Sequence, residues 1–272
     1  ANPEKVMIFF NGGGACWSTG SCDISGKPTY RPFANAEAGN DPRHYDGAFA
    51  LNNPENPFLD WSQIFVSYCT GDTWARRNAN TPGKTAPASP SRTRGGQTAA
   101  QHWSTSSTAS LHPSTWSYQV AAQVRCHHPC SPRSSRGTTT RRKSPTSPVA
   151  RGETPDTLTM PDLYRLAADA APGVRFHLFD HAYDAVQEDF LRMLGYPADL
   201  LPGLDANVAE LQAEIPLLRS YVSAGEFHTL LRYSELYSRG TNDVRAVDWV
   251  RSIINGETVD DVHCTAPAGC RQ

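Results

Sequence analysis

Between Thr73 and Gly152 the sequence lacks acidic side chains, although the chain of 272 residues holds 27 aspartates and glutamates. The same stretch carries 12 of the 25 lysines and arginines. Its aliphatic side chains are only Leu111, Val120, Val124 and Val149. Because such a composition cannot bury enough apolar surface to fold, we expect residues 73–152 to form an aberrant, basic, low-complexity and disordered segment.

Other absences limit the kinds of partner. The chain has no run of about 18 apolar residues, so we expect no membrane span. The net charge of −2 gives no electrostatic argument for nucleic acid, and the basic segment has no aromatic stacking pattern for bases beyond Trp103, Trp116 and Tyr118. No signal peptide precedes the first strand, so the sequence is expected to begin at a mature or truncated start.

The cysteines favour an exported protein. Cys16 and Cys22 bracket one short loop, and Cys264 and Cys270 bracket another. Neither pair has the two-residue spacing of a zinc knuckle, so we predict two local disulfides, with reduced thiols as the alternative. Disulfides favour a secreted or periplasmic location. Cys69 is expected to be either a buried thiol or part of a third bridge.

Outside the basic segment, predicted strands alternate with predicted helices. Strands are predicted at 6–10, 64–68, 174–179 and 218–222. Helices are predicted from Pro161, with Leu163, Leu166 and Ala167 on one face, and after Asp184 as far as Leu194. A further helix is predicted from Asn207 to Leu211 or a little beyond, ending near Pro216, and a last one at 244–254. This alternation predicts an α/β fold with a mostly parallel sheet flanked by helices, in a single domain over residues 1–272.

Three consecutive glycines, Gly12, Gly13 and Gly14, follow the first strand. The strand, Val6 to Phe10, is entirely apolar and is expected to be buried. A glycine turn at the carboxyl end of a strand can aim backbone N–H groups at a substrate oxygen, as an oxyanion hole does. The alternative is a flexible turn without a function.

Asp184 and His228 each follow a predicted strand, in the order Asp then His. In a serine hydrolase, a carboxylate orients an imidazole that takes the proton of the serine hydroxyl, and the order Ser, Asp, His is typical of α/β-hydrolases. For Asp184 the alternative is a helix cap, which is a common role of aspartate. For His228 the alternative is an ordinary surface histidine.

Four segments resemble the pectin acetylesterase and Notum carboxylesterase family, and they occur in the family's order. They are FFNGGGACW (9–17), NPFLDWSQIFVSYCTGD (56–72), AYDAVQ (182–187) and SAGEFHTLL (223–231). The resemblance implies an α/β-hydrolase-like fold and a serine esterase that uses neither cofactor nor metal. It implies Asp184 as catalytic acid, His228 as catalytic base and an oxyanion hole made by the backbone of Gly12 to Gly14.

The family's nucleophile motif, Gly-Cys-Ser-Ala-Gly, is absent, and no G-x-S-x-G occurs in the chain. Its expected place is the basic segment. If residues 116–125 are read one base upstream, their codons can encode Val-Val-Val-Ser-Gly-Cys-Ser-Ala-Gly-Ala. Our hypothesis is therefore that residues 73–152 are a frameshifted translation and that no nucleophile is encoded as written.

The sequence thus predicts a carboxylic ester hydrolase of the pectin acetylesterase type that is inactive in this form. Its expected substrate is an acylated polysaccharide or another ester. The alternative is a non-catalytic secreted protein on the same scaffold, whose basic segment binds acidic glycans. The sequence does not indicate an oligomeric state.

Overall fold

The computed structural model describes residues 2–16, 18–33, 39–69, 71, 160–265 and 268–271. They form two compact units. The first comprises the described residues of Ala1–His44 and Asp60–Thr108, and the second those of Tyr45–Leu59 and Ala109–Gln272. The basic segment 73–152 lies outside the described residues, and a single domain over 1–272 stays a prediction.

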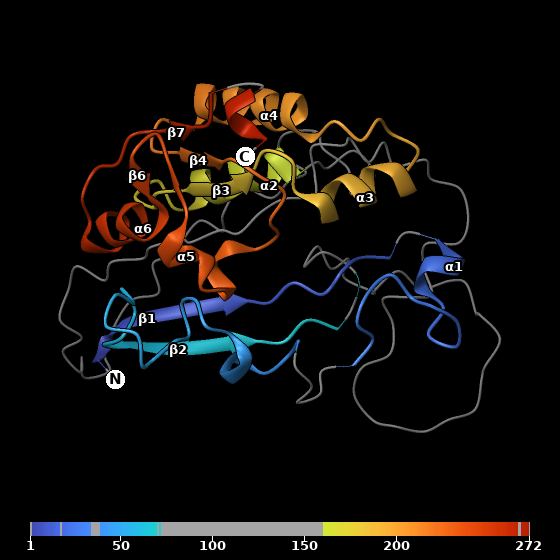
Figure 1. Cartoon of the computed structure of the whole chain (residues 1–272), viewed down its shortest axis with the longest axis horizontal. Helices are drawn as coiled ribbons and strands as arrows, with labels where there is room; N and C mark the ends of the chain where they lie inside the picture. Colours follow the sequence, from blue (N-terminus) through green and yellow to red (C-terminus); the bar gives the residue numbers. More distant parts are fainter. Residues whose placement is uncertain are drawn as a thin grey trace, which may run out of the picture. The chain divides into compact units, whose positions relative to one another are not determined.

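In the first unit, strands β1 (Asn2–Phe10) and β2 (Trp61–Val66) pair in parallel (Figure 1). The register places Phe9 opposite Phe65, and their rings stack with centroids 5.7 Å apart. The sequence predicts both strands, but each begins several residues earlier than expected. The only other regular elements described in this unit are α1 (Thr19–Cys22) and a 3-10 turn, η1 (Pro42–His44).

The expected burial of β1 is wrong: Met7 and Phe9 are only half-buried, and the opposite face is exposed. Val6, Ile8 and Phe10, which alternate along the strand, are 44%, 53% and 60% exposed. Side chains two residues apart lie on the same face of a strand. No described element of this unit covers that face, so an apolar run that is typical of a buried strand remains accessible.

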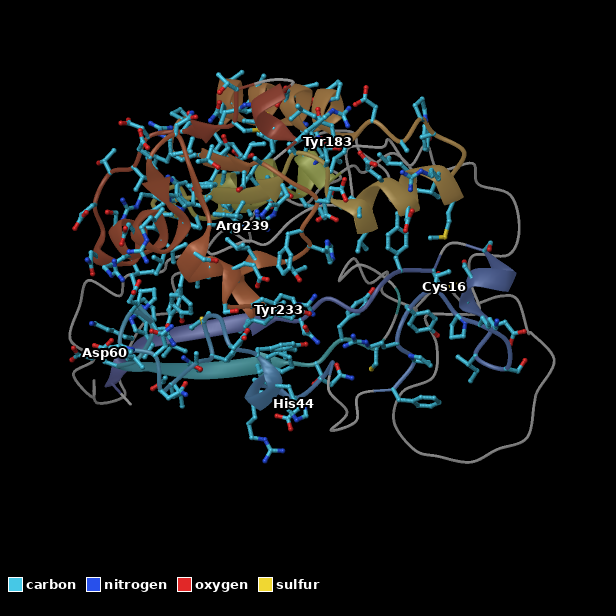
Figure 2. The ribbon with its side chains drawn as sticks, in the orientation of Figure 1. Cys16, His44, Asp60, Tyr183, Tyr233 and Arg239 are labelled. Atoms are coloured by element: carbon cyan, nitrogen blue, oxygen red, sulfur yellow. A yellow bond between two sulfur atoms is a disulfide. The ribbon has the colours of Figure 1, made fainter. Side chains whose placement is uncertain are left out.

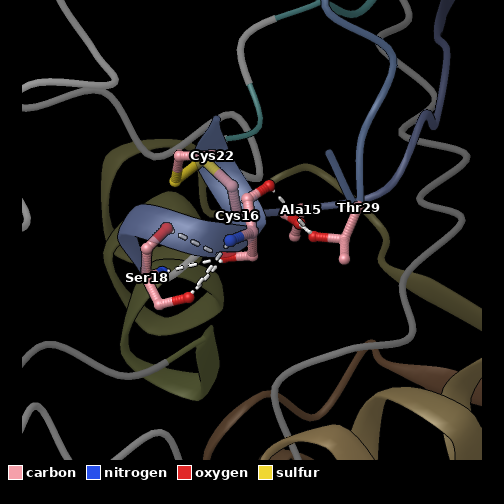
Figure 3. Close-up of a disulfide and its surroundings, with 6 residues drawn as sticks. Ala15, Cys16, Ser18, Cys22 and Thr29 are labelled. Carbon is pink, nitrogen blue, oxygen red and sulfur yellow. Dashed lines mark hydrogen bonds between the residues drawn. A yellow bond between two sulfur atoms is a disulfide. The ribbon is translucent and has the colours of Figure 1, made fainter. Parts of the chain in front are cut away.

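The first predicted disulfide joins Cys16, which precedes α1, to Cys22, the last residue of that helix (Figure 3). Ser18 caps this helix, since its Oγ accepts a hydrogen bond from the Ser21 N–H at 3.2 Å. The Ser21 Oγ accepts the Ser18 N–H in return at 2.8 Å. Cys69 is a half-buried free thiol, so it forms no third bridge within the part of the chain that the structure describes.

In the second unit, three parallel strands form a sheet in the order β3-β4-β7 (Figure 1). They are β3 (His177–His181), β4 (Arg219–Ser223) and β7 (Val262–His263). A short antiparallel pair, β5 (Gly240–Thr241) and β6 (Val244–Arg245), forms a separate sheet. The sequence predicts β3 and β4 with small shifts in their ends, and the α/β class is confirmed.

The helices and 3-10 turns of this unit are α2 (Met160–Ala170), α3 (Ala185–Met193), α4 (Leu200–Glu214), α5 (Glu235–Ser238), α6 (Ala246–Asn255), η4 (Leu230–Arg232) and η5 (Ala268–Cys270). As predicted, α3 and α6 end at glycines with positive φ, Gly195 and Gly256. Helix α4 begins earlier than predicted, at Leu200, and ends at Glu214, close to the predicted end near Pro216. No described helix is long and apolar enough to cross a membrane.

Helices cover both faces of the β3-β4-β7 sheet. Leu178 of β3 packs in one cluster with Tyr164 of α2 and Leu211 of α4. The next residue, Phe179, points to the opposite face and stacks on Tyr221 at 4.5 Å. There the ring of Trp249, from α6, lies 5.4 Å from that of Tyr221. The strands therefore run through a sandwich of helices.

The buried face of α2 differs from the prediction. The sequence predicts that Leu163, Leu166 and Ala167 lie on it, but Tyr164 is the buried aromatic residue at 5% exposure, and Ala167 is exposed. The Tyr164 ring packs edge-on against Phe176 at 5.8 Å. Because an aromatic ring buries far more area than an alanine methyl group, the helix presents Tyr164 to the sheet.

Candidate active site

Asp184 is the N-cap of α3, three residues beyond the end of β3. Its Oδ1 accepts hydrogen bonds from the backbone N–H groups of Val186 at 3.0 Å and Gln187 at 3.1 Å. The residue is 3% exposed. These bonds satisfy N–H groups that the first turn of a helix leaves without partners. The alternative that the sequence leaves open, a helix cap, is therefore correct.

His228 lies in the loop after β4 and contacts the same carboxylate. Its Nδ1 is 2.7 Å from Asp184 Oδ2. Since β3 and β4 are parallel neighbours, the loops at their carboxyl ends meet. The His228 side chain is 35% exposed, whereas that of Asp184 is 4% exposed. One partner is therefore buried and the other reaches solvent.

Backbone hydrogen bonds join the two loops. The N–H of Tyr183 donates to the carbonyl of Gly225, and the N–H of Ala185 donates to that of Glu226, each at 3.1 Å. The Gly225 N–H in turn donates to the carbonyl of Cys270 at 2.9 Å. Cys270 belongs to the second predicted disulfide, Cys264–Cys270, which the structure contains. The C-terminal disulfide loop therefore supports the segment that carries His228.

Gln187 is a further partner of Asp184 that the sequence analysis misses. Its Nε2 donates to Asp184 Oδ2 at 3.0 Å and lies 3.5 Å from Asp180 Oδ1. Gln187 is 3% exposed, and its Oε1 has no hydrogen-bond partner among the described residues. Its position three residues after an N-cap is the signal that could have found it, because that side chain points back toward the cap.

His181, the last residue of β3, is a second residue that the sequence analysis misses. It is 2% exposed, and its ring lies edge-on to Phe227 at 5.9 Å. Burial lowers the pKa of His181 to about 4, with smaller contributions from Asp184, which raises it, and from Arg239 and His228, which lower it. His181 is therefore neutral at neutral pH and packs beneath the loop that carries His228.

The pair can perform acid–base chemistry. With Nδ1–H donating to Asp184, the imidazole Nε2 is the atom that can accept a proton from a hydroxyl group. This tautomer is assigned from the hydrogen bond and not from an observed hydrogen. No described residue donates or accepts a hydrogen bond at this Nε2. The predicted site of the missing nucleophile lies outside the described residues.

The three glycines of the predicted oxyanion hole belong to the first unit. Gly14 has φ of +86° and bridges Tyr30, and a Cβ placed on it would lie 2.1 Å from the Thr29 carbonyl oxygen. Only glycine fits there. The Gly13 carbonyl accepts the N–H of Arg31 at 2.8 Å. The turn is thus held by specific contacts, and its role in catalysis stays a prediction.

One group in the described residues has the spacing of metal ligands. His263, Cys264 and Cys270 bring their ligand atoms within 4.8 Å of one another. The two sulfurs are joined in the disulfide and so offer no thiolate for a metal. The prediction that the site uses neither metal nor cofactor is not tested by this arrangement.

Comparison with known proteins links the chain to carboxylesterases. A stretch of 73 residues, 26% of this chain, is 29% identical to the palmitoleoyl-protein carboxylesterase NOTUM of Schmidtea mediterranea. The match covers 14% of that protein's length. No protein-family model matches the chain, and no solved structure is similar to it. The similarity supports a possible relationship to esterases, while the pectin acetylesterase type rests on the resemblance of the four segments.

Proposed function

We propose that this chain derives from a carboxylic ester hydrolase of the pectin acetylesterase type with an α/β-hydrolase-like fold. In it, Asp184 orients His228 as the general base. The observation that carries the proposal is the 2.7 Å contact between His228 Nδ1 and Asp184 Oδ2 at the ends of neighbouring parallel strands. The similarity to a carboxylesterase supports it.

The proposed chemistry has two halves. A serine oxygen attacks the ester carbonyl carbon while His228 Nε2 takes the hydroxyl proton, and the carbonyl oxygen becomes an anion. From the resemblance, backbone N–H groups of Gly12, Gly13 and Gly14 are proposed to bind that anion. The bond to the leaving alcohol then breaks as His228 returns the proton to it. Water releases the acyl group from the serine by the same route.

In the chain as written, this chemistry has no nucleophile. We propose that Asp184 and His228 lack the serine they would activate, because the Gly-Cys-Ser-Ala-Gly motif is absent from the sequence. We propose that residues 73–152 are a frameshifted translation and that the ancestral chain was active and folded as one domain. The two disulfides support a secreted or periplasmic protein.

The test compares two chains on p-nitrophenyl acetate. One is the 272-residue chain, and the other, the frame-restored chain, has residues 73–152 replaced by the translation read one base upstream. We expect turnover by the frame-restored chain only. Turnover by the 272-residue chain that disappears in His228→Ala would contradict the missing nucleophile, and an inactive, folded frame-restored chain would contradict the esterase proposal.

The proposed substrate is an acylated polysaccharide, from which acetyl groups are removed. The name of the planarian relative describes a carboxylesterase acting on palmitoleoyl-protein. A comparison of p-nitrophenyl acetate with p-nitrophenyl decanoate separates the two acyl classes. A preference for the acetate ester supports the pectin acetylesterase type, and a preference for the decanoate ester supports an esterase for long acyl chains.

A non-catalytic glycan-binding protein is the second candidate, favoured by the basic composition of residues 73–152. Attraction between this segment and acidic pectate would weaken as salt screens it. Co-sedimentation with pectate that is lost at high salt, and lost on deletion of residues 125–143, would support this function. Sedimentation that is unchanged by the deletion would contradict it.

A further inference from the structure

His228 lies between two residues that are each fixed by contacts of their own. The ring of Phe227 lies edge-on to those of His181 at 5.9 Å and Tyr233 at 5.5 Å. Thr229, on the other side, has φ 63° and ψ 60°, in the left-handed region. A β-branched side chain crowds the backbone there, so this conformation of threonine needs support from outside the loop.

Arg232 supplies that support through three hydrogen bonds to one residue. Its Nε and Nη2 both donate to Thr229 Oγ1, at 3.0 Å and 2.6 Å. Its backbone N–H donates to the Thr229 carbonyl oxygen at 3.2 Å. A guanidinium group presents its N–H groups in a rigid fork. The Nε–H and Nη2–H groups can therefore both donate to Thr229 Oγ1 only if that oxygen lies between them.

Arg232 is itself held firmly. The residue is 7% exposed, and its guanidinium lies 5.3 Å from the ring centre of Tyr45 and 5.6 Å from that of Tyr233. Its Nη1 donates to the Tyr45 hydroxyl at 3.4 Å. Tyr233, labelled in Figure 2, also contacts Phe227. Both neighbours of His228 are therefore tied to one cluster, made of Tyr45, Arg232 and Tyr233.

We propose that Arg232 is a positioning residue for His228. By holding Thr229 in the left-handed conformation, it sets the direction in which the His228 side chain leaves the loop and keeps Nδ1 on Asp184 Oδ2. The catalytic meaning of this role rests on the proposed function. The positioning itself is measured by the contact between His228 and Asp184, with no substrate involved.

The positioning role and a purely structural role differ in what glycine does at position 229. Glycine adopts a φ of 63° without strain, so it removes the need for support by Arg232. If Arg232 only fills space in the core, glycine at position 229 cannot compensate for its loss. Thr229→Gly in combination with Arg232→Lys therefore separates the two roles.

The test follows the Nδ1–H proton of His228 by NMR in the 272-residue chain, because a hydrogen bond to a carboxylate slows its exchange with water. We expect Arg232→Lys to raise the exchange rate about tenfold, as the strained loop relaxes away from Asp184. Arg232→Lys with Thr229→Gly should restore the original rate. Thr229→Val, which loses Oγ1 and keeps the branched Cβ, should match Arg232→Lys, and Thr229→Ser should change nothing.

Two results would overturn the proposal: no rescue by glycine in a folded double variant, or an unchanged rate in Thr229→Val. The Thr229 variants keep Arg232 in its cluster, so they decide the matter if Arg232→Lys does not fold. Failure of the esterase proposal looks different. It would appear as a frame-restored chain without turnover, while the exchange rates of the 272-residue chain still follow the expected series.

Discussion

His228 Nδ1 lies 2.7 Å from Asp184 Oδ2, while the other oxygen of the same carboxylate accepts the first backbone N–H groups of α3. Each oxygen therefore has its own partners: the helix cap is confirmed, and the contact with His228 leaves the catalytic role of Asp184 a prediction. The partial positive charge at the helix N-terminus stabilises the carboxylate, and the cap fixes its orientation toward the histidine.

Replacement of Asp184 separates capping from catalysis. Asparagine caps helices as well as aspartate, whereas alanine does not, so we expect Asp184→Ala to lower the free energy of unfolding by about 1 kcal/mol more than Asp184→Asn. In the frame-restored chain both should lower turnover, Asp184→Asn by about 10⁴-fold. Urea unfolding measures the first effect. Equal stability of the two variants would contradict the capping role.

Gln187 should stabilise the fold through its bond to the Asp184 carboxylate. We expect Gln187→Met to lower the free energy of unfolding by about 1–2 kcal/mol, because a buried bond to a charged group is lost. Removal of the unpartnered Oε1 offsets only part of that loss. Gln212→Met is the matched control, since Gln212 Nε2 donates to Asp261 Oδ1 at 2.8 Å on the surface. Its effect should stay within about 0.5 kcal/mol. Similar losses for both variants would argue against the role of Gln187.

The buried histidines of β3 should make stability depend on pH. Burial lowers the pKa of both His177 and His181 to about 4, whereas an imidazole in the unfolded chain titrates near 6.5. The unfolded chain therefore binds more protons between these values. The free energy of unfolding should be fully present above pH ~6.5 and fall by roughly 3 kcal/mol for each histidine as the pH drops to about 4.

Urea unfolding at pH 4 to 8 measures this dependence in the 272-residue chain and in His181→Leu. The variant should lose about half of the pH-dependent part, whatever its absolute stability. His177→Leu, on the same strand, is a second, parallel test and should lose a similar share of the pH-dependent part. An unchanged pH profile in both variants would show that these histidines do not cause the loss of stability at low pH.

The two disulfides allow a comparison of local and general stabilisation. Each joins cysteines six residues apart. Removal of a disulfide that closes such a short loop is expected to lower the free energy of unfolding by about 2 kcal/mol. Removal of Cys264–Cys270 by alanine substitution should also speed exchange of the His228 Nδ1–H proton, because Gly225 donates to the Cys270 carbonyl. Removal of Cys16–Cys22 should leave that proton unchanged, and equal effects would contradict the support of this loop by Cys270.

Features set by neighbouring residues can be predicted from the sequence. Asp184 and Gly195 mark the two ends of α3, and the hydrophobic runs mark β1, β2, β3 and β4. The meeting of Asp184 and His228 follows from two loops that leave adjacent parallel strands on the same edge. Helix α4 is the exception, since Asp199 makes no side-chain cap bond and its start is therefore not evident.

Features set by distant residues could not be predicted. The cluster around Arg232 depends on Tyr45, which lies 187 residues away in the sequence. The burial of His181 depends on a ring from the next strand's loop, and the exposure of Ile8 depends on what packs on β1. In each case the local sequence is compatible with several environments, and tertiary contacts select one.

The most direct measurement is kcat/KM for p-nitrophenyl acetate in the frame-restored chain and two histidine variants. His263→Ala is the matched control, because His263 Nε2 also contacts a carboxylate, Asp205 Oδ1 at 2.8 Å, on the surface. We predict a loss of at least about a thousandfold for His228→Ala and no change for His263→Ala. Turnover by the frame-restored chain that survives His228→Ala would contradict the assignment of His228 as the general base.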